Sequence, residues 1–171
     1  MTKTDQSLRR LRRQPLVDRE QWPVNLKGRD ELLDELLPHA GPMLLIDELI
    51  GWDADDEYIV GRRHVGEDHI GLEGHFPGDP VLPGTLLLEM LGQVGTALFG
   101  LLLQDEMGDE EFGVRATKIL GAHFLREVRP GQTVQLVVQA NGWDTFLGEC
   151  RAQAMVEGEI AAAMLGEVAV L

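Results

Sequence analysis

The sequence predicts an α+β fold in which one long apolar helix packs against an antiparallel β-sheet, and three observations support it. The segment from Thr85 to Leu103 is apolar almost all round, with Glu89, Gln93 and Thr96 as its polar exceptions, which is typical of a helix buried on every side. The last third of the chain reads as strand after strand, separated by turn residues. Because strands and helices do not alternate, the sheet should be antiparallel, with the helix on its concave face.

Length and charge indicate one domain with an N-terminal extension. A chain of 171 residues, 44% of them hydrophobic, suits a single domain, expected at residues 28–171 after a basic arm at residues 1–27. The arm holds seven Lys or Arg and three Asp or Glu, whereas the rest of the chain holds eight and 26. A body this acidic repels polyanions, which argues against nucleic acid as the main ligand.

The arm and the cysteine content bear on the compartment. The arm lacks the apolar stretch of a signal peptide, and its charges and prolines indicate a flexible or surface-wrapped segment that Trp22 could tether to the body. A lone Cys150 cannot form an intramolecular disulfide, so a reducing cytoplasm is the simplest expectation.

The elements before the long helix are expected to be short. Asp30 is a plausible N-cap for an amphipathic helix that carries leucines at helical spacing until Pro38 stops it. Pro42 to Trp52 and Glu57 to Val65 are strand candidates on either side of an acidic turn, and they could form a hairpin.

After the long helix, the acidic loop from Gln104 to Glu111 is expected to end it. Four strand segments follow, with Asn141-Gly142 and Glu157-Gly158 as the hairpin turns. These segments are residues 113–128, 133–140, 143–156 and 159–171.

The apolar helix has a rival interpretation as a membrane span. An acid one turn in, three glycines and the lack of a flanking basic anchor argue against insertion into a membrane. A core helix is therefore the favoured interpretation.

The stretch EGHFPGDPVLPGTLLLEMLGQ, from Glu73 to Gln93, carries the candidate chemistry. The three prolines and three glycines between Glu73 and Thr85 predict a loop of one fixed shape that presents His75. The loop leads directly into the helix, whose first amides, at Gly84 and Thr85, have no intrahelical partner and can bind an oxygen atom. Water is the ordinary partner for such amides.

Glu89 is an anomaly on an apolar helix, because an ionised carboxylate is costly to bury. It should be paired, exposed at an interface or protonated, and Gln93 stands one turn later, where it can hydrogen-bond it. A structural acid is the plain interpretation; an acid acting with the base His75 is the functional one. The five histidines and one cysteine show no metal-ligand spacing, and nucleotide-binding and serine-nucleophile motifs are absent from the sequence, so neither a metal nor a cofactor is expected.

The motif GHFPGDPVLPGTLLLEMLGQ closely resembles the signature of the bacterial β-hydroxyacyl-(acyl carrier protein) dehydratases, the FabZ and FabA families of hot-dog fold. The preceding LPHAGPMLLIDEL is similar to the family's first strand segment, with Ala40 where many FabZ-type sequences carry Arg. The resemblance covers about residues 30–171. FabA-type sequences carry Asp where this chain has Glu89, so the resemblance is closer to FabZ.

The resemblance implies a role for each matching residue. His75 would be the catalytic base and Glu89 the acid, supplied by opposite subunits of a dimer that could assemble further into a trimer of dimers. Gly84 and Thr85 would offer amides to the thioester carbonyl, and the Val81 carbonyl would orient the His75 ring. The remaining supporting positions are Gln93, Phe76 and Pro83.

The implied reaction is dehydration of a (3R)-3-hydroxyacyl thioester to the trans-2-enoyl thioester, on a substrate carried by acyl carrier protein. Arg115, Lys118, Arg126 and Arg129 are candidate contacts for that acidic carrier. Two alternatives stay open: a hot-dog acyl thioesterase, and a non-catalytic subunit that binds acyl chains or a partner.

Overall fold

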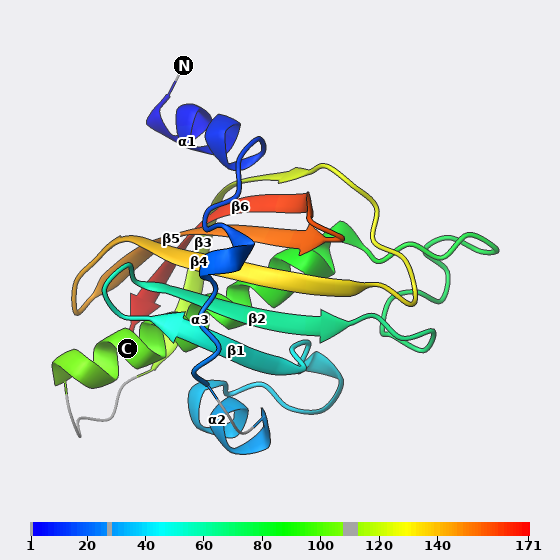
Figure 1. The fold of residues 1–171 in the computed structure, drawn as a ribbon. Coiled ribbons are helices and arrows are strands. Elements are labelled where there is room, and N and C mark those ends of the chain that lie inside the picture. Colours follow the sequence, from blue (N-terminus) through cyan, green and yellow to red (C-terminus); the bar gives the residue numbers. More distant parts are fainter. Residues whose placement is uncertain (1, 27–28, 108–112) are drawn as a thin grey trace.

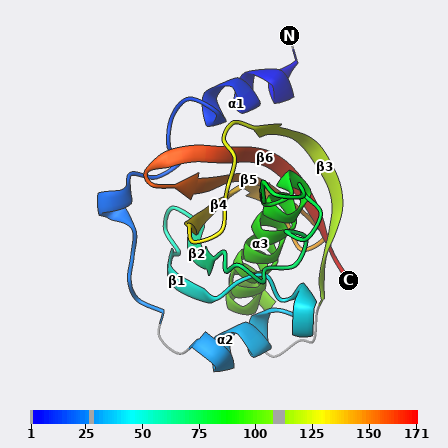
Figure 2. The ribbon, with the colours of Figure 1, turned by 90° about the vertical axis from the view of Figure 1, so that its right-hand side faces the viewer.

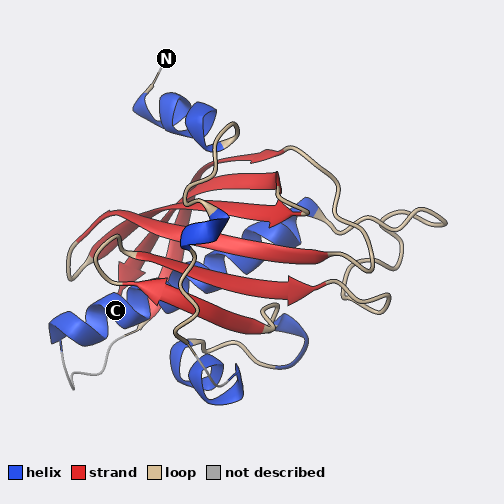
Figure 3. Ribbon diagram, viewed as in Figure 1, coloured by secondary structure: helices blue, strands red, loops and turns tan. Residues whose placement is uncertain are grey.

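The computed structural model describes residues 2–26, 29–107 and 113–171, and shows one six-stranded antiparallel sheet wrapped around one long helix (Figures 1 and 3). The strand order is β1-β2-β4-β5-β6-β3, so β1 and β3 are the edge strands. The helical elements are α1 (Lys3–Leu11), η1 (Arg19–Gln21), α2 (Arg29–Leu36), η2 (Gly41–Met43) and α3 (Gly84–Met107). The strands are β1 (Glu48–Asp53), β2 (Tyr58–His64), β3 (Val114–Phe124), β4 (Thr133–Trp143), β5 (Leu147–Val156) and β6 (Glu159–Val170).

Helix α3 is the core of the fold, as its apolar composition predicts. Figure 2 shows the sheet curving around α3, which contacts five of the six strands. Alternate residues of the strands point inward to it; on β5 these include Cys150, Ala152 and Ala154, which are buried with Phe99 of α3 in the main hydrophobic cluster. The helix is long and apolar enough to cross a membrane, but 72% of its most apolar window is buried inside the fold. The prediction of a core helix and an antiparallel hot-dog arrangement is confirmed.

Two predicted helix boundaries differ from the structure. Helix α2 begins at Arg29, so Asp30 lies in its first turn and is not the N-cap. Helix α3 continues to Met107, into the acidic segment that was expected to be loop, and the rest of that segment lies outside the described residues. A hydrophobic helix can extend past its apolar stretch here because Gln104, Glu106 and Met107 belong to residue types that favour helices.

The hairpin turn predicted at Asn141-Gly142 is wrong. Both residues belong to β4, where the pairing with β5 shifts register between Ala140 and Trp143, and Gly142 has φ +120°. They form a bulge, a common use of glycine inside a strand. The chain reverses three residues later, where the Asp144 carboxylate accepts hydrogen bonds from the amides of Phe146 and Leu147. The Glu157-Gly158 turn is present as predicted.

The basic arm contains a helix that the sequence analysis did not predict. Helix α1 begins with a capping box, in which Thr2 and Asp5 satisfy each other's backbone amides. Leu8 and Leu11, one turn apart, are buried against β6 on the outer face of the sheet (Figure 1). With two leucines among polar and charged residues, the segment is too short to show a clear helical periodicity in the sequence.

The remainder of the arm crosses the outer face of the sheet. Leu16, Val17 and Trp22 pack on a buried cluster formed by Tyr58, Val60 and Val137. The sheet therefore lies between α3 on one face and the arm on the other, and the expected tethering role of Trp22 agrees with this packing.

Candidate active site

The loop before α3 holds His75 in one orientation. The His75 Nδ1 lies 2.8 Å from the Val81 carbonyl oxygen, and the Val81 amide donates to the His75 carbonyl at 2.8 Å, so the two residues are joined in both directions. The peptide between His75 and Phe76 is cis, and the Phe76 ring stacks on the imidazole with centroids 4.2 Å apart. Since a carbonyl oxygen only accepts, Nδ1 carries the proton in this contact and Nε2 of the neutral ring is free to act as a base.

A salt bridge braces the same loop from outside. Arg129 donates to the Asp79 carboxylate and, at 2.7 Å, to Glu127. The guanidinium of Arg129 holds the pKa of Asp79 below its usual range. Asp79 thus helps to hold the shape of the loop.

His75 faces a cleft at the N-terminal end of α3. The cleft, about 590 Å³ in volume, is lined by His75, Val81, Pro83, Gly84, Thr85 and Phe124, among others. A Cβ at Gly84 would lie 2.7 Å from the Phe124 ring, so the absence of a side chain at Gly84 lets the ring close over the helix terminus. The first-turn amides of α3 at this end lack intrahelical acceptors and carry the positive end of the helix dipole, which suits a developing oxyanion.

Glu89 lies one turn further along α3 in a polar cluster of its own. The buried Gln93 donates to the Glu89 carboxylate at 2.8 Å and to the Met43 carbonyl at 2.7 Å, and accepts from the Leu45 amide at 3.0 Å. His39 Nε2 lies 3.6 Å from the same carboxylate. The expected contact between Gln93 and Glu89 is present.

The carboxylate of Glu89 is not sealed in the core, because 38% of its side chain is exposed in the single chain. The described residues that line the His75 cleft do not include Glu89, His39 or Gln93. One chain therefore presents a base beside an amide-lined cleft and, separately, an acid on a partly exposed surface of α3.

The four cations proposed as carrier contacts differ in their surroundings. Arg126 lines the cleft and pairs with Glu157 and Glu159, and Arg129 is engaged as described. Lys118 lies 4.0 Å from Glu167, whereas the Arg115 guanidinium donates to the Val114 carbonyl. Only Arg126 of the four lines the cleft.

Three contributors to this site were not predicted from the sequence. They are His39, Phe124 and the Met43 to Leu45 backbone, to which the sequence patterns assign no role. The segment LPHAGPMLL, which contains both His39 and that backbone, was the signal that could have located them. Within residues 2–26, 29–107 and 113–171, no group of three or more His, Cys, Asp or Glu side chains could hold a metal ion.

Comparison with known families gives a specific result. Residues 37–164 match the family model described as a FabA-like domain. The chain is 37% identical over 131 residues to the 3-hydroxyacyl-(acyl-carrier-protein) dehydratase FabZ of Latilactobacillus sakei, covering 75% of this chain and 89% of that protein. The FabZ of Chloroflexus aggregans is also 37% identical, over 126 residues, with 74% and 84% covered.

Solved structures share the fold at low sequence identity. The dehydratase heterocomplex ApeI:P from Xenorhabdus doucetiae matches with a TM-score of 0.61 at 19% identity, over 80% of this chain and 89% of that one. A mutant thioesterase from Pseudomonas aeruginosa matches with a TM-score of 0.64 at 16% identity, over 85% and 94%. At this identity the likeness supports the hot-dog architecture alone, because dehydratases and thioesterases share it.

Proposed function

The chain belongs to the FabA-like domain family, and from this premise we propose how it acts as a 3-hydroxyacyl-(acyl carrier protein) dehydratase. The enzyme is a lyase that converts a (3R)-3-hydroxyacyl thioester to the trans-2-enoyl thioester, in fatty-acid or related acyl-chain synthesis. The observation that carries the proposal is the fixed His75, whose Nε2 is free beside the N-terminal amides of α3.

In the proposed mechanism, His75 Nε2 removes a proton from C2 of the substrate. Negative charge then develops on the thioester oxygen, where the amides of Gly84 and Thr85 stabilise it; losing one such donor typically costs about 10²- to 10³-fold in rate. The C2–C3 double bond forms as the C3–O bond breaks, and the departing hydroxyl takes a proton from the Glu89 carboxyl group and leaves as water. The reaction is redox-neutral, and this chemistry requires no cofactor.

The acid is proposed to come from a second copy of the chain. Two observations support this: Glu89 is separate from the cleft of its own chain, and β3 leaves one edge of the sheet unpaired. Beside that edge, Ile119, Phe124 and Leu125 are 56%, 54% and 42% exposed, an apolar surface suited to a partner. Pairing of two β3 edges would form a dimer, with further assembly into a trimer of dimers also proposed.

The substrate arrives on acyl carrier protein, an expectation supported by the names of the FabZ relatives. We place the carrier contact at the mouth of the cleft, where Arg126 lies, and include Arg129, Arg115 and Lys118 as weaker contributors to a basic strip. A cytoplasmic location is part of the same proposal.

The test of the reaction is the enoyl absorbance of acyl carrier thioesters of several chain lengths, which rises during dehydration and falls during hydration. We expect His75→Ala and Glu89→Ala each to lose at least about 10²-fold in rate. The matched controls are His64→Ala, an exposed histidine, and Glu106→Ala, an exposed acid on the same helix. A thiol reagent run in parallel detects a thioesterase. Thiol release without enoyl formation, or full activity in His75→Ala, would refute the dehydratase mechanism.

The shared site is tested by mixing the two inactive variants. If subunits exchange, dimers with one His75→Ala and one Glu89→Ala chain contain one complete site, so activity should return. Light scattering reports the oligomer size in the same samples. No recovery after verified exchange would mean that both residues act within one chain.

A further inference from the structure

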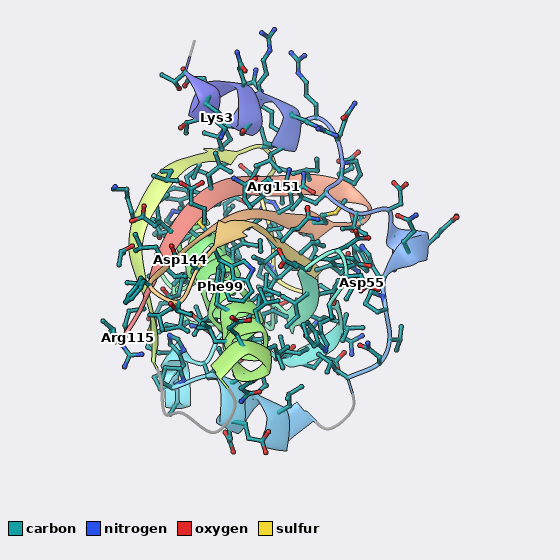
Figure 4. The ribbon with its side chains drawn as sticks, turned by 90° about the vertical axis from the view of Figure 1, so that its left-hand side faces the viewer. Lys3, Asp55, Phe99, Arg115, Asp144 and Arg151 are labelled. Carbon is teal, nitrogen blue, oxygen red and sulfur yellow. The ribbon has the colours of Figure 1, made fainter. Side chains whose placement is uncertain are left out.

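A second cavity lies on the other side of the sheet, between the basic arm and β4 and β5. It has a volume of about 370 Å³ and is lined by Gln6, Ser7, Arg10, Gln14, Gln139 and Arg151, among others. None of its lining residues is shared with the His75 cleft. We call it the arm pocket. Figure 4 labels Arg151 on the side of the sheet next to α1.

Arg151 in this pocket is unusual among the half-buried arginines. Arg63, Arg126 and Arg129 are similarly covered, and each pairs with at least one carboxylate. Among the described residues, Arg151 has Gln139 as its one side-chain partner, to which its Nη2 donates at 3.0 Å; its Nε, like that of Arg63, is buried with no hydrogen-bond partner. A half-buried guanidinium that has no carboxylate partner favours binding of an anion beside it.

Arg10 adds a second positive charge to the same cavity. Within the part of the chain that the structure describes, no carboxylate lies within 4.0 Å of Arg10 or Arg151. Burial lowers the pKa of Arg151, and so does the like charge of Arg10 in the same cavity. The formal net charge of the whole chain is −14, so this pair is a positive site on an acidic protein.

Hydrogen bonds from one buried side chain hold the arm in the position that forms one wall of the pocket. Gln153, a fully buried residue on the outer face of β5, accepts from the Leu16 amide at 2.7 Å. Its Nε2 donates to the carbonyls of Leu11 and Gln14, the latter at 2.8 Å. One side chain thus fixes the turn that follows α1, and with it the wall of the pocket that carries Arg10.

We propose that the arm pocket binds a small oxyanion, a phosphate or carboxylate group, between Arg10 and Arg151. A guanidinium group offers several donors in a planar fork that matches such oxygens, and Ser7 and the glutamine side chains add neutral hydrogen-bonding groups to the walls. Because one ligand group belongs to α1 and the other to β5, an anion bound here would strengthen docking of the arm. The site is independent of the dehydratase reaction, so its test does not use activity.

The test is isothermal titration calorimetry of the full-length protein with inorganic phosphate, and separately with acetate, at ionic strength held constant with NaCl. We expect saturable binding, and a rise of a few degrees in Tm at saturating anion. Phosphate binding without acetate binding identifies a phosphate site; the reverse identifies a carboxylate site.

Three variants locate the site, and a fourth serves as a matched control. Arg151→Gln and Arg10→Gln should each weaken binding by at least about tenfold through loss of a charge-assisted contact. Arg9→Gln, an exposed neighbour on α1 that does not line the pocket, should bind as the wild type does. Gln153→Leu should weaken binding without removing a ligand, by releasing the arm.

Arg10 is exposed, so Arg10→Gln should fold even if Arg151→Gln does not. The proposal is overturned if neither anion binds above the NaCl background. It is equally overturned if Arg10→Gln binds as tightly as Arg9→Gln, since the ions would then be responding to net charge alone.

Discussion

Replacing Gln93 with Leu should both destabilise the fold and slow the enzyme, because this one side chain joins α3 to the segment before β1. Leu keeps much of the volume but removes the hydrogen bonds to Leu45, Met43 and Glu89. The Leu45 amide is buried, and an unsatisfied buried donor costs about 1–3 kcal/mol. The Met43 carbonyl is only partly buried, so water can replace its lost donor at smaller cost.

The expected loss is therefore about 1–3 kcal/mol, which lowers the urea midpoint by about 0.5–1.5 M if the m-value is about 2 kcal/mol/M. The matched control is Gln104→Leu, an exposed position on the same helix, which should stay within about 0.5 kcal/mol of wild type. In the proposed mechanism Gln93→Leu also frees Glu89 to rotate, so kcat should fall with little change in KM. A midpoint equal to that of Gln104→Leu would refute the reasoning, because the Leu45 amide would then have found another partner.

Three further outcomes are expected. Gly84→Ala should reduce both activity and stability, because its Cβ would lie 2.7 Å from the Phe124 ring. Adding Phe124→Ala should restore the stability that the clash removes. Unfolding curves that show no such rescue would contradict the close contact. Hydrogen bonds from backbone amides lower the pKa of Asp144, so its contribution to stability is present above about pH 4 and is lost as pH falls through the folded-state pKa. Asp144→Asn should therefore flatten the acid limb of the urea midpoint plotted against pH, and an unchanged limb would assign acid unfolding to other carboxyls. Burial raises the pKa of Cys150 to about 11, so its thiol should resist a disulfide reagent at pH 8 in the native protein and react once unfolded; fast native reaction would show that β5 opens readily.

The core of the fold could be predicted because its signal is local. A long apolar helix that carries a single acid is stable in water only when most of its surface is buried, and Thr85 to Leu103 lies in the core of the fold. The Asn141-Gly142 turn could not be assigned by the same reasoning. A glycine with positive φ, such as Gly142, fits either a hairpin turn or a β-bulge, so the dipeptide does not distinguish the two. The turn forms instead at Asp144, whose side chain accepts hydrogen bonds from the amides that follow it.

The candidate site was predictable in part for a related reason. His75, Val81 and Gly84 are close in sequence, so a constrained loop motif is enough to bring them together. The contact of His39 with Glu89 joins residues 50 positions apart and depends on how α2 and the following loop settle on α3. Because helical or strand periodicity carries no information about a contact between distant segments, the sequence does not predict this one.

The arm changes which part of the chain behaves as the cooperative unit. The family model begins at residue 37, yet the outer face of β5 is closed by residues from the first 20 positions through Gln153. A strand covered on both faces and paired on both edges exchanges its amide hydrogens only through large openings. Deuterium uptake at Ala152 to Met155 should thus depend on whether an N-terminal segment more than 130 residues away in sequence is docked. The part of the chain that protects these amides from exchange therefore begins earlier than the part that matches the family model.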